Sequence, residues 1–120
     1  MFLISKQHRK DVEGKEVERS ITECLKQHNL RIIKRNYVCP LAEIDVLAEG
    51  ENGLIVFIEI KERNSGKFGL GRDAIDEGKK RRMRNACAYY LKYVVKKSCP
   101  VRFDLIEVNQ GVPIYIENIF

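Results

Sequence analysis

The sequence lacks the long apolar run, the cysteine motifs and the repeats that mark several large classes of protein. No apolar run approaches the roughly 20 residues that a membrane helix needs. The apolar start MFLI is followed at once by KQHRK, so it is too short for the core of a signal peptide. A content of 44% hydrophobic and 32% charged residues also excludes a disordered or fibrous chain. We therefore expect a globular cytoplasmic protein that does not associate with membranes.

The four cysteines carry no sign of a zinc site or a redox motif. Cys24, Cys39, Cys87 and Cys99 show no C-x-x-C spacing and no nearby histidine partner. Cys24 and Cys87 fall within helical patterns, as small core residues do. We expect free thiols in a reducing compartment.

The length of 120 residues suits one domain, 1–120, and no repeat or linker divides it. We expect residues 1–11 to form a less ordered extension. Apolar residues at helical spacing predict helices over 12–28 and 73–97. Segments rich in β-branched and aromatic residues predict strands over 31–38, 43–48, 54–61, 101–108 and 114–119. The order α-β-β-β-α-β-β indicates an α/β domain with a central mixed five-stranded sheet flanked by helices.

Residues 42–63, AEIDVLAEGENGLIVFIEIKER, predict a hairpin with a short loop. A three-residue loop 51–53, with Gly53 in the left-handed conformation that such loops favour, pairs Gly50 with Leu54. The register matters because a slip of one residue moves every side chain to the other face.

This register gathers charged side chains on one face of the hairpin. Counting outward from the loop places Asp45 opposite Glu59 and Glu43 opposite Lys61. Opposed residues have Cβ atoms about 5 Å apart, so two carboxylates there can share one cation. One interpretation is a surface ion-pair ladder worth about 1 kcal/mol or less. The other is a Mg²⁺ site, because this cation prefers carboxylate oxygens and water and completes its shell with phosphate.

Glu18 is a candidate third carboxylate. It lies at the edge of the apolar stripe of the first helix, formed by Val17, Ile21 and Leu25, from where its side chain can reach inward. Three carboxylates and a lysine form the grouping expected of metal-assisted phosphodiester hydrolysis, in which Lys61 orients water or neutralises charge. A solvated helix residue is the alternative interpretation of Glu18.

The net charge of +5 favours an anionic partner, most simply nucleic acid. Like charges gather in KKRRMR at 79–84 and in the residues just after the hairpin. These runs predict phosphate contacts or, alternatively, a solvated helix face. The candidates for phosphate contact are Arg63, Lys67, Arg72, Lys79 and Arg82.

The glycine-rich loop GKFGLG lacks the G-K-[ST] ending of a nucleotide-binding loop, so we expect no nucleotide cofactor. Phe68 in this loop is either a stacking group for nucleic acid or a core residue.

An ordered series of motifs over about 14–120 resembles the YraN-like family of largely uncharacterised bacterial proteins. That family is similar in turn to archaeal Holliday-junction resolvases and to the PD-(D/E)XK nuclease superfamily. The family usually has glycine where this chain has Val17 and Ala42. The motifs are G-x-x-x-E-x-x-x-x-x-x-L from Gly14, R-N-Y from Arg35, A-E-I-D from Ala42, F-I-E-I-K-E-R from Phe57, F-G from Phe68, K-x-R-R from Lys79 and R-F-D from Arg102.

The resemblance implies a restriction-endonuclease-like fold and a Mg²⁺-dependent endonuclease, with Mn²⁺ as a substitute metal. It implies that Asp45 and Glu59 are catalytic acids and metal ligands, that Lys61 is the catalytic lysine, and that Glu18 completes the metal shell. Glu43 is peripheral. The implied partner is DNA, including branched DNA, and the resolvase relatives imply a homodimer.

Two other functions remain open from the sequence. The same fold can serve as a nucleic-acid-binding or assembly module without turnover, and metal-dependent cleavage separates that module from a nuclease. A basic protein-interaction domain is the third possibility, and it predicts no steep salt dependence of DNA binding.

Overall fold

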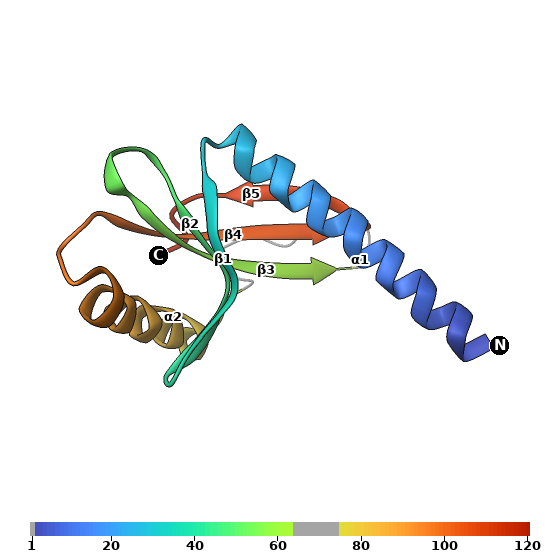
Figure 1. The fold of residues 1–120 in the computed structure, drawn as a ribbon, viewed down its shortest axis with the longest axis horizontal. Coiled ribbons are helices and arrows are strands. Elements are labelled where there is room, and N and C mark those ends of the chain that lie inside the picture. Colours follow the sequence, from blue (N-terminus) through green and yellow to red (C-terminus); the bar gives the residue numbers. More distant parts are fainter. Residues whose placement is uncertain (1, 64–74) are drawn as a thin grey trace.

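The structure, a computed structural model, describes residues 2–63 and 75–120, with side chains from residue 15 onward. A five-stranded sheet is flanked by two helices, as the sequence pattern predicts (Figure 1). The strands run in the order β1-β2-β3-β4-β5, and only β3 and β4 are parallel. The elements are α1 (Phe2–Gln27), β1 (Arg31–Cys39), β2 (Ala42–Glu49), η1 (Glu51–Gly53), β3 (Ile55–Arg63), α2 (Glu77–Tyr90), η3 (Leu91–Val95), β4 (Val101–Asn109) and β5 (Val112–Ile116).

Each helix covers one face of the sheet because β3 is apolar on both. Val56 and Ile58 pack in the cluster that contains Ile21 and Leu25 of α1. Phe57 faces the other way and packs with α2. The buried stripe of α2 consists of Met83, Ala86, Cys87 and Tyr90. A central strand buried on both faces is typical of a sheet enclosed by helices.

The β2–β3 turn has the predicted register. The Gly50 N–H donates to the Leu54 carbonyl at 2.9 Å, and Gly53 has φ of 77°. The ladder then pairs Leu47 with Phe57. This register determines which side chains meet at the far end of the hairpin.

The ends of three elements differ from the sequence predictions. α1 begins at Phe2, not near residue 12, so residues 2–11 are helical where we expected a less ordered extension. The first turns of α1 extend past the sheet (Figure 1). α2 begins at Glu77 and passes into a π-helical turn that ends at Val95, and β5 ends at Ile116.

Three of the cysteines, Cys24, Cys39 and Cys87, are buried, and all four thiols are free. Among residues 2–63 and 75–120, no helix is both long and apolar enough to cross a membrane.

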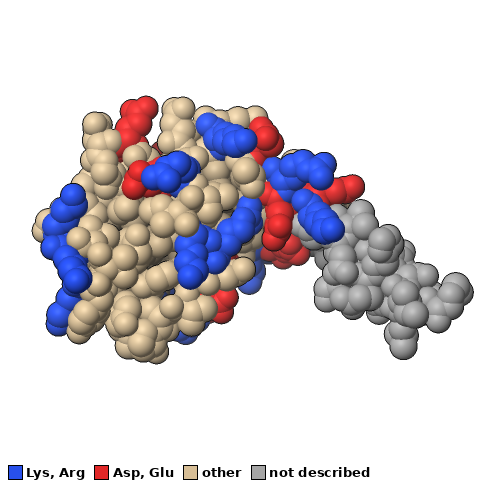
Figure 2. Space-filling model, viewed as in Figure 1, with Lys and Arg blue, Asp and Glu red and all other residues tan. Residues whose placement is uncertain are grey.

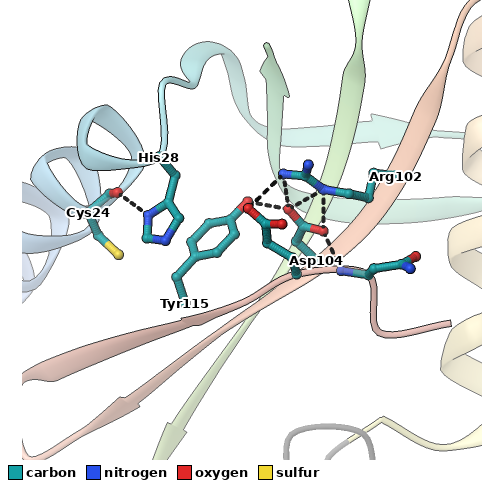
Figure 3. Close-up of polar contacts among 7 residues, drawn as sticks. Cys24, His28, Arg102, Asp104 and Tyr115 are labelled. Carbon is teal, nitrogen blue, oxygen red and sulfur yellow. Dashed lines mark hydrogen bonds and ion pairs between the residues drawn. The ribbon is translucent and has the colours of Figure 1, made fainter. Parts of the chain in front are cut away.

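A buried polar cluster joins β4 to β5 and the C-terminal segment. Asp104, which is fully buried, accepts hydrogen bonds from the Arg102 guanidinium at 2.8–3.0 Å and from the Asn118 N–H at 2.9 Å. The Tyr115 hydroxyl also donates to Asp104, and the His28 ring stacks on Tyr115 with the centroids 4.3 Å apart (Figure 3). A carboxylate with this many donors is stable inside a protein despite its burial.

Replacing Asp104 with Ala removes these bonds and leaves the partly buried Arg102 without its main counter-ion. We expect the free energy of unfolding to fall by about 3–5 kcal/mol, measured by urea titration. The control is Glu117→Ala, since Glu117 is 52% exposed and its Oε1 lies 3.7 Å from the same guanidinium. We expect the control to change stability by less than about 0.5 kcal/mol. Equal losses in the two variants would show that Asp104 has no special structural role.

Candidate active site

The candidate site lies where β2 and β3 separate. The ladder between these strands runs from Glu49–Ile55 to Val46–Ile58 and then ends. Asp45 is the next residue on β2 and Glu59 the next on β3, so the register that pairs Val46 with Ile58 brings the two acids together. This is the juxtaposition that the hairpin count predicts.

Asp45 fills a gap in the backbone hydrogen bonding at this fork. Its Oδ2 accepts a hydrogen bond from the Ile60 N–H at 2.9 Å. Counting in twos from the Gly50–Leu54 bond, an unbroken ladder would direct that N–H to the carbonyl of Ile44. The Asp45 carboxylate therefore replaces a strand carbonyl, and the Ile60 N–H keeps an acceptor where the strands separate.

The bend at Asp45 involves β1 as well. Ile44 packs in the cluster on the α2 side and Val46 in the cluster on the α1 side, although alternate residues of a regular strand share a face. The β1 residue opposite Asp45 is Asn36, whose φ is 52°. In both strands, the alternation of side chains between the two faces of the sheet is therefore interrupted at the same point.

This bend corrects one sequence prediction. Beyond Asp45, β2 no longer pairs with β3, and Glu43 pairs with Val38 of β1. The expected pairing of Glu43 with Lys61 is therefore wrong, because the count from the loop assumed that the ladder continued. Glu43 is exposed and remains peripheral to the acid pair.

Glu59 faces α2 and is largely buried. Its side chain is 15% exposed, and Lys79 Nζ lies 2.9 Å from its Oε2. Burial raises the pKa of Glu59 to about 7; the adjacent Lys79 lowers that pKa and the charge of Asp45 raises it. Glu59 Oε2 accepts no hydrogen bond of good geometry from the described residues. It is a desolvated carboxylate whose nearby counter-charge is one ammonium group.

The other two predicted catalytic residues are exposed. Lys61 is exposed on β3 and shares the face of Glu59 by strand alternation. Glu18 is exposed on α1; its backbone carbonyl, not its carboxylate, accepts hydrogen bonds from Arg35 and Thr22. Within the described part of the chain, no three His, Cys, Asp or Glu residues gather closely enough to hold a metal ion. The structure thus brings Asp45 and Glu59 together without Glu18.

Two carboxylates are nevertheless a suitable donor set for Mg²⁺. This cation is commonly held by one or two carboxylates and keeps several waters or takes phosphate oxygens as further ligands. Glu59 Oε2 is a buried acceptor whose neighbour among the described residues is the Lys79 ammonium, itself a cation. Asp45 and Glu59 therefore fit a hydrated divalent cation without a third acid.

The predicted phosphate-binding residues fall into three groups. Lys79 faces Glu59, and Arg63 Nε lies 2.8 Å from Oε1 of the buried Glu107. Arg82 is exposed on α2. Lys67, Phe68 and Arg72 lie outside the described residues. Figure 2 shows lysine and arginine in separate patches on the face that it presents.

Lys79 is the residue at this site whose place the sequence analysis missed. Its signal was Asp76, a typical N-cap residue just before the basic run, whose Oδ1 accepts the Lys79 N–H at 2.7 Å. A helix that begins there puts Lys79 one turn before the buried Met83. Lys79 thus belongs to the covered stripe of α2.

The raised pKa of Glu59 predicts a pH-dependent stability difference between the protein and its Glu59→Gln variant. Between the ordinary pKa of 4.5 and the folded value of about 7, the folded protein keeps a proton that the unfolded chain has lost. Stability therefore falls as pH rises through this interval, whereas glutamine copies the protonated form. We expect equal stability near pH 4 and an advantage of about 2–3 kcal/mol for Glu59→Gln above pH 8. Thermal unfolding in a chelator tests this, and an advantage independent of pH would contradict it.

Comparison with known proteins matches residues 17–108 to the model of the uncharacterised protein family UPF0102. A UPF0102 protein of Caldicellulosiruptor saccharolyticus is 37% identical and covers 82% of this chain and 83% of its own length. One from Lachnoclostridium phytofermentans is 38% identical, over 92% of this chain and 94% of its own. Among solved structures, Pyrococcus furiosus SfsA in complex with Ca²⁺ shows a weak likeness, with a TM-score of 0.27 and 16% identity over 90% of this chain and 63% of that one. The matched motifs and the extent of these alignments show that the chain belongs to the UPF0102 family, the YraN family that its motifs resemble.

Proposed function

We propose that this protein is a metal-dependent endonuclease that hydrolyses phosphodiester bonds in DNA, with structured or branched DNA as its substrate. The observation that carries the proposal is the pair Asp45 and Glu59 at the fork between β2 and β3. Burying adjacent carboxylates costs free energy unless a cation compensates their charge. A site that keeps this pair on two strands otherwise rich in apolar residues is suited to binding a cation.

The protein groups have distinct roles in this proposal. The hydrogen bond from the Ile60 N–H holds the Asp45 carboxylate in one orientation. Its other oxygen is therefore already in place before a cation binds. Glu59 supplies the second carboxylate from the α2 side. Lys61, on the same face and exposed, can donate to the attacking water or to a phosphate oxygen. When bound, a divalent cation would lower the pKa of a water and stabilise charge on the phosphate.

One feature of the structure favours a binding module without turnover as the second candidate. Glu18 is exposed on α1, and among the described residues no third acid joins Asp45 and Glu59. Such a module would retain DNA binding and lose hydrolysis. The cleavage experiment separates the two functions.

Cleavage of labelled duplex, single-stranded, flapped and four-way-junction DNA with Mg²⁺ or Mn²⁺ tests the proposal. We expect Asp45→Asn, Glu59→Gln and Lys61→Ala each to lose about 100-fold or more in rate. Lys61→Ala should still bind DNA, whereas Asp45→Asn should also bind metal more weakly. Paired cuts across a four-way junction would require two copies of the site, so a homodimer is part of the proposal for that substrate.

The control for this experiment is Glu43→Gln, which removes an exposed carboxylate from the same strand. We expect it to cleave within about twofold of the parent, because Glu43 pairs with β1 and not with the acid pair. Parent-like rates in all three site variants would remove Asp45, Glu59 and Lys61 from the mechanism. Salt-sensitive binding with no cleavage under either metal would favour the binding module.

DNA binding is expected to use the exposed cations of α2. Replacing Arg82 with Ala should reduce the slope of log affinity against log salt by about one unit, since one phosphate contact is lost. Lys26→Ala is the matched control, because it removes an exposed positive charge from α1 on the other side of the sheet. Fluorescence anisotropy over a salt series measures both slopes, and equal slopes would exclude Arg82 from the interface.

A further inference from the structure

Lys79 differs from its neighbour Lys80 in the carboxylate that it faces. Both lysine side chains are partly covered, with 25% of Lys79 and 19% of Lys80 exposed. The ammonium of Lys79 lies 2.9 Å from the 15%-exposed side chain of Glu59, whereas Lys80 pairs with Glu77, whose side chain is 86% exposed. The same helix therefore carries one ion pair with a desolvated carboxylate at the acid site and one with a solvated carboxylate.

The start of α2 holds the backbone of Lys79 in place. The Asp76 carboxylate accepts the Lys79 N–H, and the Asp76 carbonyl accepts the Lys80 N–H at 3.0 Å. One turn later, Met83 is fully buried against the sheet. The ammonium, in contrast, is carried on a flexible stem of four methylene groups, so it can leave Glu59 while the helix stays in place.

The ammonium and a divalent cation would compete for the same oxygen. Lys79 faces Glu59 Oε2, the buried atom that otherwise lacks a hydrogen-bond donor among the described residues. Two cations beside one carboxylate repel each other, and the repulsion is stronger where water is largely excluded. Occupation of the oxygen by one cation therefore disfavours the other.

We propose that Lys79 is the resting counter-ion of the acid pair, which neutralises Glu59 in the metal-free protein and is displaced when a divalent cation binds to Asp45 and Glu59. This inference rests on the proposed function for its metal site but not on DNA cleavage. Lys79 acts through Glu59 and is a positioning residue. Once displaced, its ammonium is available to an anionic substrate, so metal and DNA binding are expected to reinforce each other.

Lysine acetylation at limiting reagent, read by peptide mass spectrometry, tests the displacement directly. We expect the reactivity of Lys79 to rise severalfold when Mg²⁺ saturates the protein, and the reactivity of Lys80 to stay unchanged. In Asp45→Asn, higher Mg²⁺ should be needed for the same rise. Unchanged Lys79 reactivity at saturating Mg²⁺ would overturn the proposal.

Calorimetric titration with Mg²⁺ at pH 8.5 gives a second readout. Lys79→Met removes the competing charge and is expected to bind Mg²⁺ severalfold more tightly, whereas Lys79→Arg keeps the charge and should bind like the parent. Lys80→Met is the matched control and should leave the affinity unchanged. Equal affinities in Lys79→Met and the parent would overturn the proposal.

The two proposals fail separately. Mg²⁺-dependent exposure of Lys79 without cleavage of any DNA supports the counter-ion and contradicts the endonuclease. Cleavage with Lys79 reactivity insensitive to Mg²⁺ supports the endonuclease and overturns the counter-ion. Absence of Mg²⁺ binding contradicts both.

Discussion

The hydrogen bond from the Ile60 N–H to the Asp45 carboxylate is the contact on which the candidate site depends. This bond lies at the point where β2 and β3 separate, and the Asp45 carboxylate there accepts the N–H that a backbone carbonyl would accept in a continuous ladder. The bend that follows turns Ile44 and Val46 into different layers of the core. The separation of β2 and β3 at Asp45 therefore shapes both the candidate site and the sheet.

Three covered acids on β3 and β4, Asp104, Glu107 and Glu59, have different surroundings. Asp104 is fully buried and satisfied by Arg102, Tyr115 and a backbone N–H. Glu107 is buried beside Arg63. Glu59 differs from Asp104 because, among the described residues, its buried Oε2 has the Lys79 ammonium as its cationic partner and no N–H or O–H donor of good geometry. A saturated carboxylate is suited to structural support, whereas a partly satisfied one is available to an additional cation.

Much of the fold could be predicted because its signals are local. The element order, the turn at Gly53 and the proximity of Asp45 to Glu59 follow from periodicity, turn chemistry and a two-residue count. The pairing of Glu43 could not be predicted, because a count outward from the hairpin loop does not show where the ladder ends. The contact of Lys79 with Glu59 depends on how α2 lies on the sheet, which is a tertiary property. The start of α1 at Phe2 was missed because the prediction relied on apolar periodicity, which the sequence shows only from about residue 12 onward.

The central claim is that Asp45 and Glu59 together hold a divalent cation. Anomalous diffraction from crystals grown with Mn²⁺ tests it most directly, because the metal is located without reference to activity. The account predicts an anomalous peak within coordination distance of both carboxylates, about 2.0–2.4 Å from an oxygen of each. Crystals at saturating Mn²⁺ with no peak between Asp45 and Glu59 would contradict it.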